Sequence, residues 1–433
     1  MSETDIHRAI EAVWKMEAAK VIAGLTRIVR DLDLAEDLAQ EALLVALEKW
    51  PSTGIPPKPG AWLMSTAKHR ALDHFRAVER GGRKYEELGR ELRALEQMPP
   101  DILSAMDDPI GDDVLRLIFI SCHPVISAES RPALTLRVVG GLTTDEIARA
   151  FLVPEPTIAQ RIVRAKKTLG QKRIPFEVPR GLDLAARLSS VLEVIYLIFN
   201  EGYSATAGEE LIRASLCDEA LRLGRILAEL DPREPEVHGL VALMEIQASR
   251  SRARVDASGE PVLLLEQNRG LWDQLLIRRG LAALARANAL TPARGPYALQ
   301  AEIAACHARA LTADATDWGR IVELYTELAQ MSPSPIIELN RAVAVSMHAG
   351  PEQALRLLDP LMSDPVMKSY HLLPSVRGDL LSRLSRQAEA AAEFERAASM
   401  TRNAREQKLL LDRARQSREQ ILFAPKVDAR RTD

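Results

Sequence analysis

The 433-residue sequence has few aromatic residues and few cysteines. Phe, Trp and Tyr make up 4% of the chain, whereas Ala, Leu, Arg and Glu dominate, which favours helix over sheet. Cys122, Cys217 and Cys306 form no CxxC pair, so neither a disulfide framework nor a zinc motif is indicated. The stretch SCHP (121–124) places a thiol beside an imidazole, but no further ligand is near in sequence. We therefore predict no metal site there.

The sequence also lacks a membrane-targeting pattern. Its first residues, MSETDIHRAI, have neither the basic start nor the apolar core of a signal peptide. The most apolar stretch, LAARLSSVLEVIYLIF, carries Arg187 and Glu193 and is too short to span a bilayer. We therefore expect a cytoplasmic protein without membrane contact.

Charge of either sign is not in large excess, since the formal net charge is −3. The charges are nevertheless segregated: residues 86–113 hold nine acids and two arginines, and residues 161–173 hold six bases and no acid. DNA affinity depends on local Lys and Arg side chains that neutralise phosphates. A slightly acidic total therefore does not exclude a DNA-binding segment.

Residues 142–169, LTTDEIARAFLVPEPTIAQRIVRAKKTL, have the pattern of a helix-turn-helix. Thr143 is placed to cap a first helix, and Glu146, three residues later, completes a capping box. After a turn at FLVPEP, apolar residues recur at helical spacing and predict one buried face on a second helix: Ile158, Ile162, Ala165 and Leu169. Pro154 and Pro156 fall in its first turn, where proline is tolerated.

The polar face of this second helix carries side chains suited to reading DNA: Gln160, Arg161, Arg164 and Lys167. Arg and Gln pair bidentately with guanine and adenine edges in the major groove. A solvated basic helix face explains the same pattern, so this helix alone leaves both interpretations open.

Two more helices are predicted upstream, at 31–50 and 61–77, separated by the turn-rich STGIPPKPG. The first has a buried stripe of Ala35, Leu38, Ala42 and Val45, with Asp37, Glu41 and Glu48 on an opposite acidic face. In the second, the residues expected to pack inward are Trp62, Leu63, Ala67, Ala71 and Phe75. By pattern alone, the first is an ordinary amphipathic helix with a solvated acidic side.

Taken in this order, the blocks resemble bacterial RNA polymerase sigma factors of the extracytoplasmic-function (ECF) type, which keep only the domains called region 2 and region 4. DLAEDLAQEALLVAL (33–47) resembles the region 2 helix that docks on the coiled coil of the β′ subunit. AWLMSTAKHRALDHFR (61–76) resembles the segment that melts and reads the −10 element. Residues 127–169 are similar to region 4, which binds the −35 element. Two such motifs separated by an acidic linker are more specific than either alone.

The resemblance assigns contacts to individual residues. The polymerase-binding positions are Asp37, Gln40 and Glu41. The −10 positions are Lys68, His69, Asp73 and Arg76, where the family typically has Arg-Asn in place of Lys68-His69 and Asp73 lies beside the flipped base. The −35 positions are Gln160, Arg161, Arg164 and Lys167. Pro154 stands where the family usually has a capping Ser or Thr.

The chain continues well beyond region 4, where most members of that family end, and this extension has a helical repeat. Its spacing is typical of tetratricopeptide repeats: Ala220, Gly224, Leu227 and Pro232; Ile321, Tyr325, Leu328 and Pro333; Ala354, Leu358 and Leu361; Ala390, Phe394 and Ala397. Ala342 and Gly378 are small residues at which paired helices can approach closely. The alternative is generic antiparallel helices without this repeat. Such helices would leave the predicted solenoid class little changed.

Three stretches do not fit the repeat and resemble signature segments of a sigma-factor subgroup with such an extension: IYLIFNEGYSA (195–205), NRGLWDQLLIRRGLAAL (268–284) and GPYALQAEIAACHA (295–308). In the first, Asn200, Glu201 and Tyr203 form no evident nucleophile–base pair. We interpret them as packing or partner contacts.

The sequence thus predicts an all-α protein with region 2 as a helical bundle (1–85), an acidic linker (86–111), region 4 as a helix-turn-helix (112–176), a TPR-like α-solenoid (180–425) and a tail (426–433). The resemblance implies an alternative sigma factor that binds core RNA polymerase through its β′ and β subunits, recognises −35/−10 promoter DNA and promotes melting. It implies no active site, metal or other cofactor. The solenoid is expected to regulate or stabilise this activity, with a small DGPF/YCII-related protein as a candidate partner.

Two other functions are compatible with part of the sequence. One is a one-component helix-turn-helix transcription regulator with a TPR sensor domain, which has no use for the block at 31–77. The other is a peptide-binding scaffold, which predicts that deleting residues 1–180 leaves the main activity intact.

Overall fold

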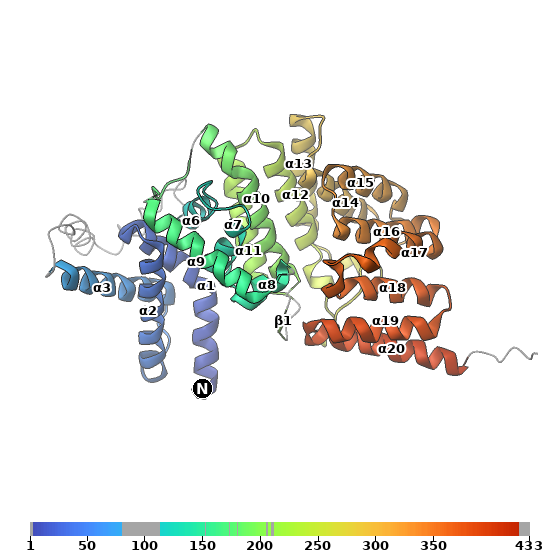
Figure 1. Cartoon of the computed structure of the whole chain (residues 1–433), viewed down its shortest axis with the longest axis horizontal. Coiled ribbons are helices and arrows are strands. Elements are labelled where there is room, and N and C mark those ends of the chain that lie inside the picture. Colours follow the sequence, from blue (N-terminus) through green and yellow to red (C-terminus); the bar gives the residue numbers. More distant parts are fainter. Residues whose placement is uncertain are drawn as a thin grey trace, which may run out of the picture. The chain divides into compact units, whose positions relative to one another are not determined.

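The computed structural model describes residues 3–79, 113–151, 153–172, 174–179, 181–204, 207–208 and 212–423. These residues are mostly helical, which confirms the predicted all-α fold (Figure 1). They belong to two compact units, Met1–Ile198 and Phe199–Asp433. The predicted acidic linker (86–111) and tail (426–433) lie outside the described residues. None of the described helices is long and apolar enough to cross a bilayer.

The N-terminal unit contains two groups of helices. Its described helices are α1 (Glu3–Val29), α2 (Leu32–Thr53), α3 (Pro59–Glu79), α6 (Asp113–Ser121), α7 (Ser130–Val138), α8 (Thr144–Ala150), α9 (Glu155–Lys172) and most of α10 (Leu182–Tyr203). Helices α1, α2 and α3 pack against one another, and α7, α8 and α9 form a second group. Helix α6 packs against both α1 and α7 and so connects the two groups.

Helix α2 begins where the sequence indicates but continues through Pro51 to Thr53, beyond the predicted end at residue 50. The Asp31 carboxylate accepts a hydrogen bond from the Leu34 amide at 3.1 Å and caps the first turn. After Thr53, Gly54 adopts φ +81°, a left-handed conformation that a glycine tolerates. The predicted stripe Ala35, Leu38, Ala42 and Val45 is buried, which confirms that interpretation of the helix. Beside it, the Trp50 and Trp62 rings meet edge to face at 5.2 Å.

Helix α10 connects the two units. The division between them falls after Ile198, later than the predicted boundary at 176–180. The first part of α10 packs on the helix-turn-helix group, where the Arg131 guanidinium donates to the Ser190 hydroxyl at 3.1 Å. This contact explains why these residues belong to the N-terminal unit.

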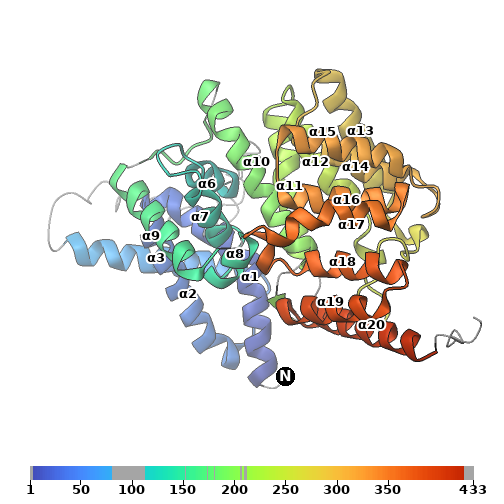
Figure 2. The same cartoon turned by 45° about the vertical axis from the view of Figure 1, so that its right-hand side comes forward.

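The C-terminal unit is a stack of antiparallel helix pairs (Figures 1 and 2). Its helices are α11 (Ala214–Leu230), α12 (Pro235–Ala248), α13 (Gln274–Leu290), α14 (Pro296–Arg309), α15 (Trp318–Met331), α16 (Pro335–Ala349), α17 (Pro351–Leu358), α18 (Leu372–Arg383), α19 (Gln387–Met400) and α20 (Ala404–Phe423). Short 3-10 helices lie at Ser251–Ala253, Arg269–Leu271, Asp359–Ser363 and Met367–Ser369. Strands β1 (Ala207–Gly208) and β2 (Arg402–Asn403) pair in parallel.

Small residues mark the close approaches that the repeat predicts. A Cβ atom added at Gly378 in α18 would lie 2.8 Å from the Phe394 ring of α19. One added at Gly224 in α11 would lie 2.7 Å from the Met244 methyl group of α12. Ala342, Ala354 and Leu358 share one buried cluster. The predicted close packing of paired helices is therefore confirmed at these positions.

Glu245 stabilises the first three helices of this unit. Its side chain is 2% exposed, and its Oε1 atom lies 2.9 Å from Nε of Arg225 in α11 and 3.4 Å from Nε of Arg279 in α13. Removing one member of a buried ion pair leaves the remaining charge uncompensated. Because Glu245 lies on α12 and pairs with an arginine on each neighbour, its carboxylate joins α11, α12 and α13.

We expect Glu245→Ala to lower the free energy of unfolding by about 1–3 kcal/mol, because the variant loses a charge-assisted hydrogen bond from Arg225 to a buried carboxylate. Urea denaturation followed by circular dichroism measures this change. Glu323→Ala is the matched control, since Glu323 forms a solvent-exposed pair with Arg320. The control should cost less than about 1 kcal/mol. Equal losses in both variants would contradict this role of Glu245.

Candidate nucleic-acid interface

The helix-turn-helix of α8 and α9 has the predicted capping geometry. Thr143 Oγ1 accepts from the Glu146 amide at 3.2 Å, and Glu146 Oε2 accepts from the Thr143 amide at 2.8 Å, so the capping box is confirmed. Leu142 and Ile147, the residues around the cap, are both fully buried. Helix α9 starts at Glu155, after Pro154 and with Pro156 in its first turn. Its buried residues are Ile158, Ile162, Ala165 and Leu169, as predicted.

The predicted −35 residues lie on the opposite side of α9. Gln160, Arg164 and Lys167 are exposed and Arg161 is half-buried. Within the described ranges, no carboxylate forms an ion pair with Arg161, Arg164 or Lys167. These cations are therefore available to phosphates and base edges.

The predicted −10 residues lie on α3. His69, Asp73 and Arg76 are exposed at steps of four and three, which places them on one side of the helix. Asp73 and Arg76 form an ion pair at 3.5 Å, and a ring nitrogen of His69 lies 2.7 Å from the Ser65 carbonyl oxygen. Lys68 differs because it is half-buried, and burial followed by the charge of Arg27 lowers its pKa.

The predicted polymerase-binding residues Asp37, Gln40 and Glu41 are exposed on α2. Leu44 lies on the same side, one turn beyond Gln40 and Glu41, and its 59% exposure is high for an apolar residue. The sequence interpretation did not include Leu44, because the apolar pair Leu44–Val45 gives no sign of which member faces the core. The exposed side of α2 thus combines acidic, amide and apolar groups.

A contact that the sequence did not indicate joins α9 to α2. Lys166 Nζ lies 2.6 Å from Glu36 Oε2 and 3.1 Å from Asp33 Oδ1. Burial lowers the pKa of Lys166, but these two carboxylates raise it above its ordinary value. A second link joins Arg27 of α1 to Asp113 of α6 at 3.6 Å. The helix-turn-helix group is therefore bound to the α1–α3 bundle by charge pairs in this structure.

Cys122 and His123, the thiol–imidazole pair of the SCHP stretch, directly follow α6. Cys122 is fully buried and its Sγ atom lies 3.9 Å from the Thr135 hydroxyl; burial raises the pKa of the thiol to about 12. His123 Nδ1 accepts from the Val125 amide at 3.1 Å. Across the described segments, no group of three or more His, Cys, Asp or Glu side chains is arranged to hold a metal ion.

The FNEGYSA residues make packing contacts in the C-terminal unit. Glu201 is 3% exposed and pairs with Arg213 at 3.3 Å. The Tyr203 ring stacks on that of Phe199 at 5.6 Å, and its hydroxyl accepts from Arg250. These contacts agree with the interpretation that the motif serves packing.

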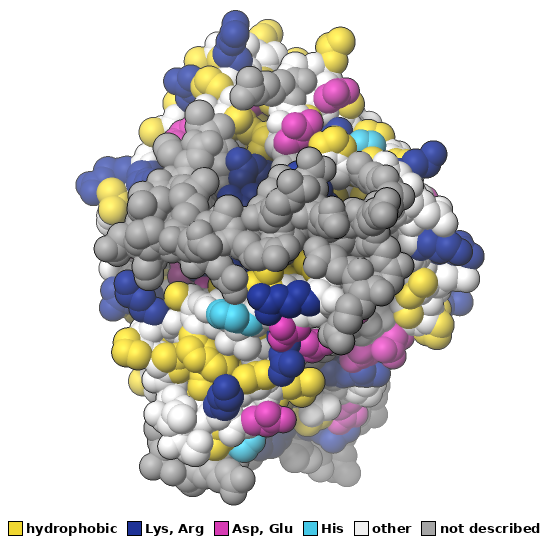
Figure 3. All heavy atoms as spheres, turned by 90° about the vertical axis from the view of Figure 1, so that its left-hand side faces the viewer, with side chains coloured by type: hydrophobic (Ala, Val, Ile, Leu, Met, Phe, Trp, Pro, Cys, Tyr) yellow, Lys and Arg dark blue, Asp and Glu magenta, His cyan; other side chains and the backbone are white. Residues whose placement is uncertain are grey.

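One face of the molecule carries charges of both signs. In Figure 3, the Lys and Arg side chains shown in colour lie interspersed with Asp and Glu. This face is not a broad positive surface, so contact of DNA phosphates with it would depend on local groups.

Family models match three parts of this chain. Residues 14–81 match sigma-70 region 2, and residues 116–169 match sigma-70 region 4. Residues 187–288 match a family of unknown function, DUF6596. The first two matches cover the helices that carry the predicted contact residues, and the third covers the start of the extension.

Similar proteins are known over most of the chain and over a smaller part of it. An uncharacterized protein of Rhizobium meliloti (strain 1021), R00370, is 44% identical over 400 residues, which cover 89% of this chain and 90% of that protein. The ECF RNA polymerase sigma factor SigK of Mycobacterium sp. (strain KMS) is 26% identical over 37% of this chain and 81% of its own length. The probable ECF RNA polymerase sigma factor SigI of Mycobacterium tuberculosis (strain CDC 1551 / Oshkosh) is 25% identical over 40% of this chain and 58% of its own length.

A tetratricopeptide repeat protein of Parabacteroides merdae ATCC 43184 covers 69% of this chain and 96% of its own, at 16% identity and a TM-score of 0.34. We identify the C-terminal unit as a solenoid from its stack of antiparallel helix pairs. The two sigma-70 regions and the similarity to ECF sigma factors identify the family of the chain. The chain belongs to the ECF family of RNA polymerase sigma factors, in the subgroup that carries a helical extension after region 4.

Proposed function

We propose that this alternative sigma factor binds core RNA polymerase through the exposed side of α2 and reads promoter DNA through α3 and α9. The observation that supports this most strongly is the exposure of all three predicted polymerase-binding residues together with the basic side of α9 in one compact unit. The sigma-70 matches cover these helices. A one-component regulator would have no use for the exposed acidic side of α2.

Promoter melting is assigned to α3. A melted −10 strand needs a pocket for flipped bases and cations along its backbone. Asp73 and Arg76 lie on the exposed side of α3, next to each other and accessible to a strand. Because core polymerase holds both DNA readers, each binding step is effectively intramolecular and neither reader needs high affinity alone.

Copurification tests the polymerase interaction. An affinity-tagged full-length chain should retain core RNA polymerase on the column at physiological salt. The one-component regulator predicts instead that the free chain protects an operator from nuclease digestion and retains no polymerase. If the column retains no polymerase and the free chain protects an operator from nuclease digestion, the proposal is contradicted.

The compact N-terminal unit must open on a promoter. Positions −35 and −10 are about 25 base pairs apart, or about 85 Å of B-form DNA at about 3.4 Å per pair. A compact body of 198 residues has a radius of gyration of about 16 Å and is thus roughly 40 Å across. We propose that α9 separates from α2 when the polymerase and promoter are bound, breaking the contact of Lys166 with Glu36 and Asp33.

We expect Lys166→Glu to open the N-terminal unit of the free protein, because it places three carboxylates together. Spin labels are placed at the exposed positions 49 on α2 and 172 on α9. Pulsed electron paramagnetic resonance then measures the distance between the two labels. The distance distribution should shift to longer values in this variant. Lys167→Glu is the control, since Lys167 is exposed and makes no ion pair with α2. An identical distribution in Lys166→Glu and wild type would contradict the opening.

Regulation through the C-terminal unit is the remaining part of the proposal. A chain ending at Ile198 keeps the N-terminal unit, including the part of α10 that packs on α7. If the extension regulates activity, this truncated chain should differ from the full chain in promoter output in vitro. Unchanged output, with the truncated chain still folded by circular dichroism, would remove the regulatory role. A DGPF/YCII-related protein stays a candidate partner, to be tested by copurification with the full chain.

A further inference from the structure

Three arginines of the C-terminal unit gather around two aromatic rings. The guanidinium carbons of Arg250 and Arg254 lie 5.8 and 3.8 Å from the centroid of the Tyr203 ring. Those of Arg250 and Arg269 lie 5.7 and 5.0 Å from the Trp272 ring. We call Arg250, Arg254 and Arg269 the arginine cluster; Arg250 is its central member because it contacts both rings.

The arginine cluster has no acidic partner in ion-pair contact among the described residues. Its members donate hydrogen bonds to neutral oxygens instead. Arg250 donates to the Tyr203 hydroxyl at 2.6 and 3.1 Å, Arg254 donates to the Tyr203 carbonyl, and Arg269 donates to the carbonyls of His307 and Ala310, each at 2.6 Å. The Glu406 carboxylate attracts Arg254 without an ion-pair contact. Arg250 and Arg269 form no ion pair with a carboxylate among the described residues.

Helix ends offset only part of this charge. Arg254 and Arg269 contact carbonyls at the C-terminal ends of α10 and α14, and each helix end carries about half a negative charge. Neither helix end contacts Arg250, whose printed hydrogen bonds go to the neutral Tyr203 hydroxyl. Burial, followed by the charge of Arg250, lowers the pKa of Arg269, so the repulsion persists in the folded protein.

Buried polar atoms without hydrogen-bond partners lie next to the cluster. Trp272 and His307 are 3% and 7% exposed, and neither Nε1 of Trp272 nor Nδ1 of His307 has a hydrogen-bond partner in the described part of the chain. Nε of Arg269 is also buried and has no hydrogen-bond partner among the described residues. An unsatisfied buried polar group destabilises the folded protein. The indole and guanidinium groups are donors only, so an acceptor would satisfy them.

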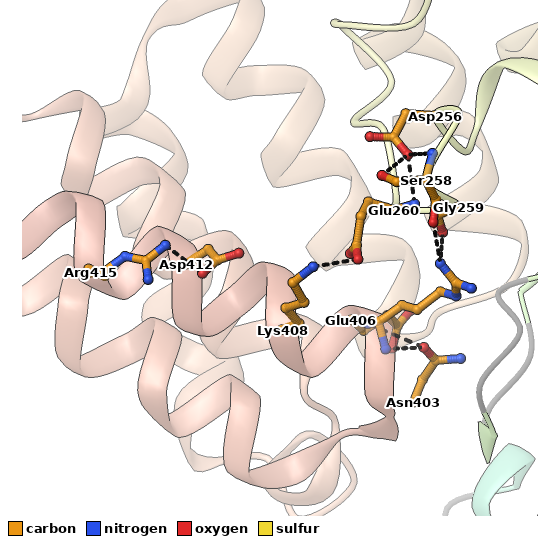
Figure 4. A network of polar contacts seen from close by, with 10 residues as sticks. Asp256, Ser258, Gly259, Glu260, Asn403, Glu406, Lys408, Asp412 and Arg415 are labelled. Carbon is orange, nitrogen blue, oxygen red and sulfur yellow. Dashed lines mark hydrogen bonds and ion pairs between the residues drawn. The ribbon is translucent and has the colours of Figure 1, made fainter.

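The segment that carries Arg250, Arg254 and Arg269 is held in place by α20. This insert (residues 249–273, between α12 and α13) forms a turn in which the Asp256 carboxylate accepts from the Ser258 and Glu260 amides at 2.8 and 2.9 Å. Glu260 pairs with Lys408 of α20 at 2.5 Å (Figure 4). Arg405 donates to the Gly259 carbonyl. The cluster is therefore fixed before any ligand binds, which reduces the entropy cost of binding.

We propose that the arginine cluster is a binding site for a small molecule bearing a phosphate or carboxylate group. Arg250 and Arg269 would neutralise the anion, and the Trp272 indole N–H would donate a hydrogen bond to it. Guanidinium groups suit both anions because their N–H groups match two oxygens at once. Each of the three arginines is partly exposed. Anion binding itself does not depend on the proposed sigma activity; only its use as a signal does.

The pKa of His307 provides a direct readout on the full chain. Burial, followed by the charges of Arg250 and Arg269, lowers this pKa to about 4. An anion bound at the cluster would offset these charges, and we expect saturating inorganic phosphate to raise the pKa of His307 by about one unit or more. Carbon-13 labelled histidine reports the titration by NMR, and His307→Gln assigns the signal. Sodium chloride at matched ionic strength controls for screening.

Substitutions locate the site. Arg250→Gln should weaken phosphate binding, measured by calorimetry, about tenfold or more, because it removes a charge-assisted contact. Arg250→Lys should weaken it less, and Arg278→Gln, an exposed arginine on α13, should leave it unchanged. Succinate in place of phosphate shows which anion is preferred, and binding of either supports the site.

The proposal is overturned if neither phosphate nor succinate moves the pKa of His307 more than chloride does. It is equally overturned if Arg278→Gln weakens binding as much as Arg250→Gln. Should Arg250→Gln fail to fold, the wild-type titration decides the matter alone. Promoter output is measured separately, so a chain that binds phosphate yet directs no transcription would contradict the proposed function and leave the site intact.

Discussion

Asp37→Arg on α2 is expected to lower the affinity for core RNA polymerase by about tenfold to a hundredfold, since reversing a charge at a complementary interface replaces attraction with repulsion. Asp37 is exposed and lies on the same side of α2 as Gln40, Glu41 and Leu44. The folding of α2 should be unaffected, because the buried stripe on its other side is unchanged. Fluorescence anisotropy of the labelled chain titrated with core polymerase measures the affinity.

Glu11→Arg is the matched control for Asp37→Arg. Glu11 is an exposed acidic residue of α1, 65% exposed, and it precedes the segment that matches region 2. This variant carries the same change of net charge. We expect it to bind core polymerase within about twofold of wild type, since the exposed i,i+4 ion pair of Glu11 with Lys15 contributes little to stability. Equal losses in the two variants would mean that total charge, and not the side of α2, determines binding.

Arg164→Ala on α9 is expected to weaken recognition of the −35 element by about 1–3 kcal/mol, the range for a side chain that contacts a base edge. Arg164 is exposed and has no carboxylate partner among the described residues. Competition between promoter DNA and DNA with a scrambled −35 element, measured with the holoenzyme, reports the specificity ratio. The variant should lose discrimination between the two DNAs.

Lys172→Ala is the control for Arg164→Ala. Lys172 is exposed at the last residue of α9, away from the predicted base-contacting positions. Losing a phosphate contact should weaken binding to both DNAs alike and reduce the salt dependence by about one phosphate. If Arg164→Ala also weakened binding to both DNAs equally, Arg164 would contact only the DNA backbone.

Much of the local structure could be predicted from the sequence. The buried face of α9, the capping box at Thr143 and the small residues at Gly224 and Gly378 all follow from helical periodicity and side-chain chemistry. Such patterns depend on residues within one or two turns of each other, so the printed sequence contains both partners. The candidate contact residues follow from the same patterns combined with a family resemblance.

Contacts between distant segments could not be predicted in this way. Lys166 looks like any other base on α9, and only the fold brings it to Glu36. The arginine cluster joins Tyr203 of α10 to Arg269 of the insert, and Arg405 meets Gly259 across 146 positions. Helical periodicity says which side of a helix is buried, but not which helix covers it. These pairings therefore required the structure.

Run-off transcription with purified core RNA polymerase tests the central claim most directly. Adding the full-length chain to core polymerase should produce a transcript with one defined 5′ end from a genomic promoter, and Asp37→Arg and Arg164→Ala should each reduce it strongly while Glu11→Arg does not. The result that would contradict the account is a transcript pattern that is the same with and without the chain on DNA that the chain itself binds.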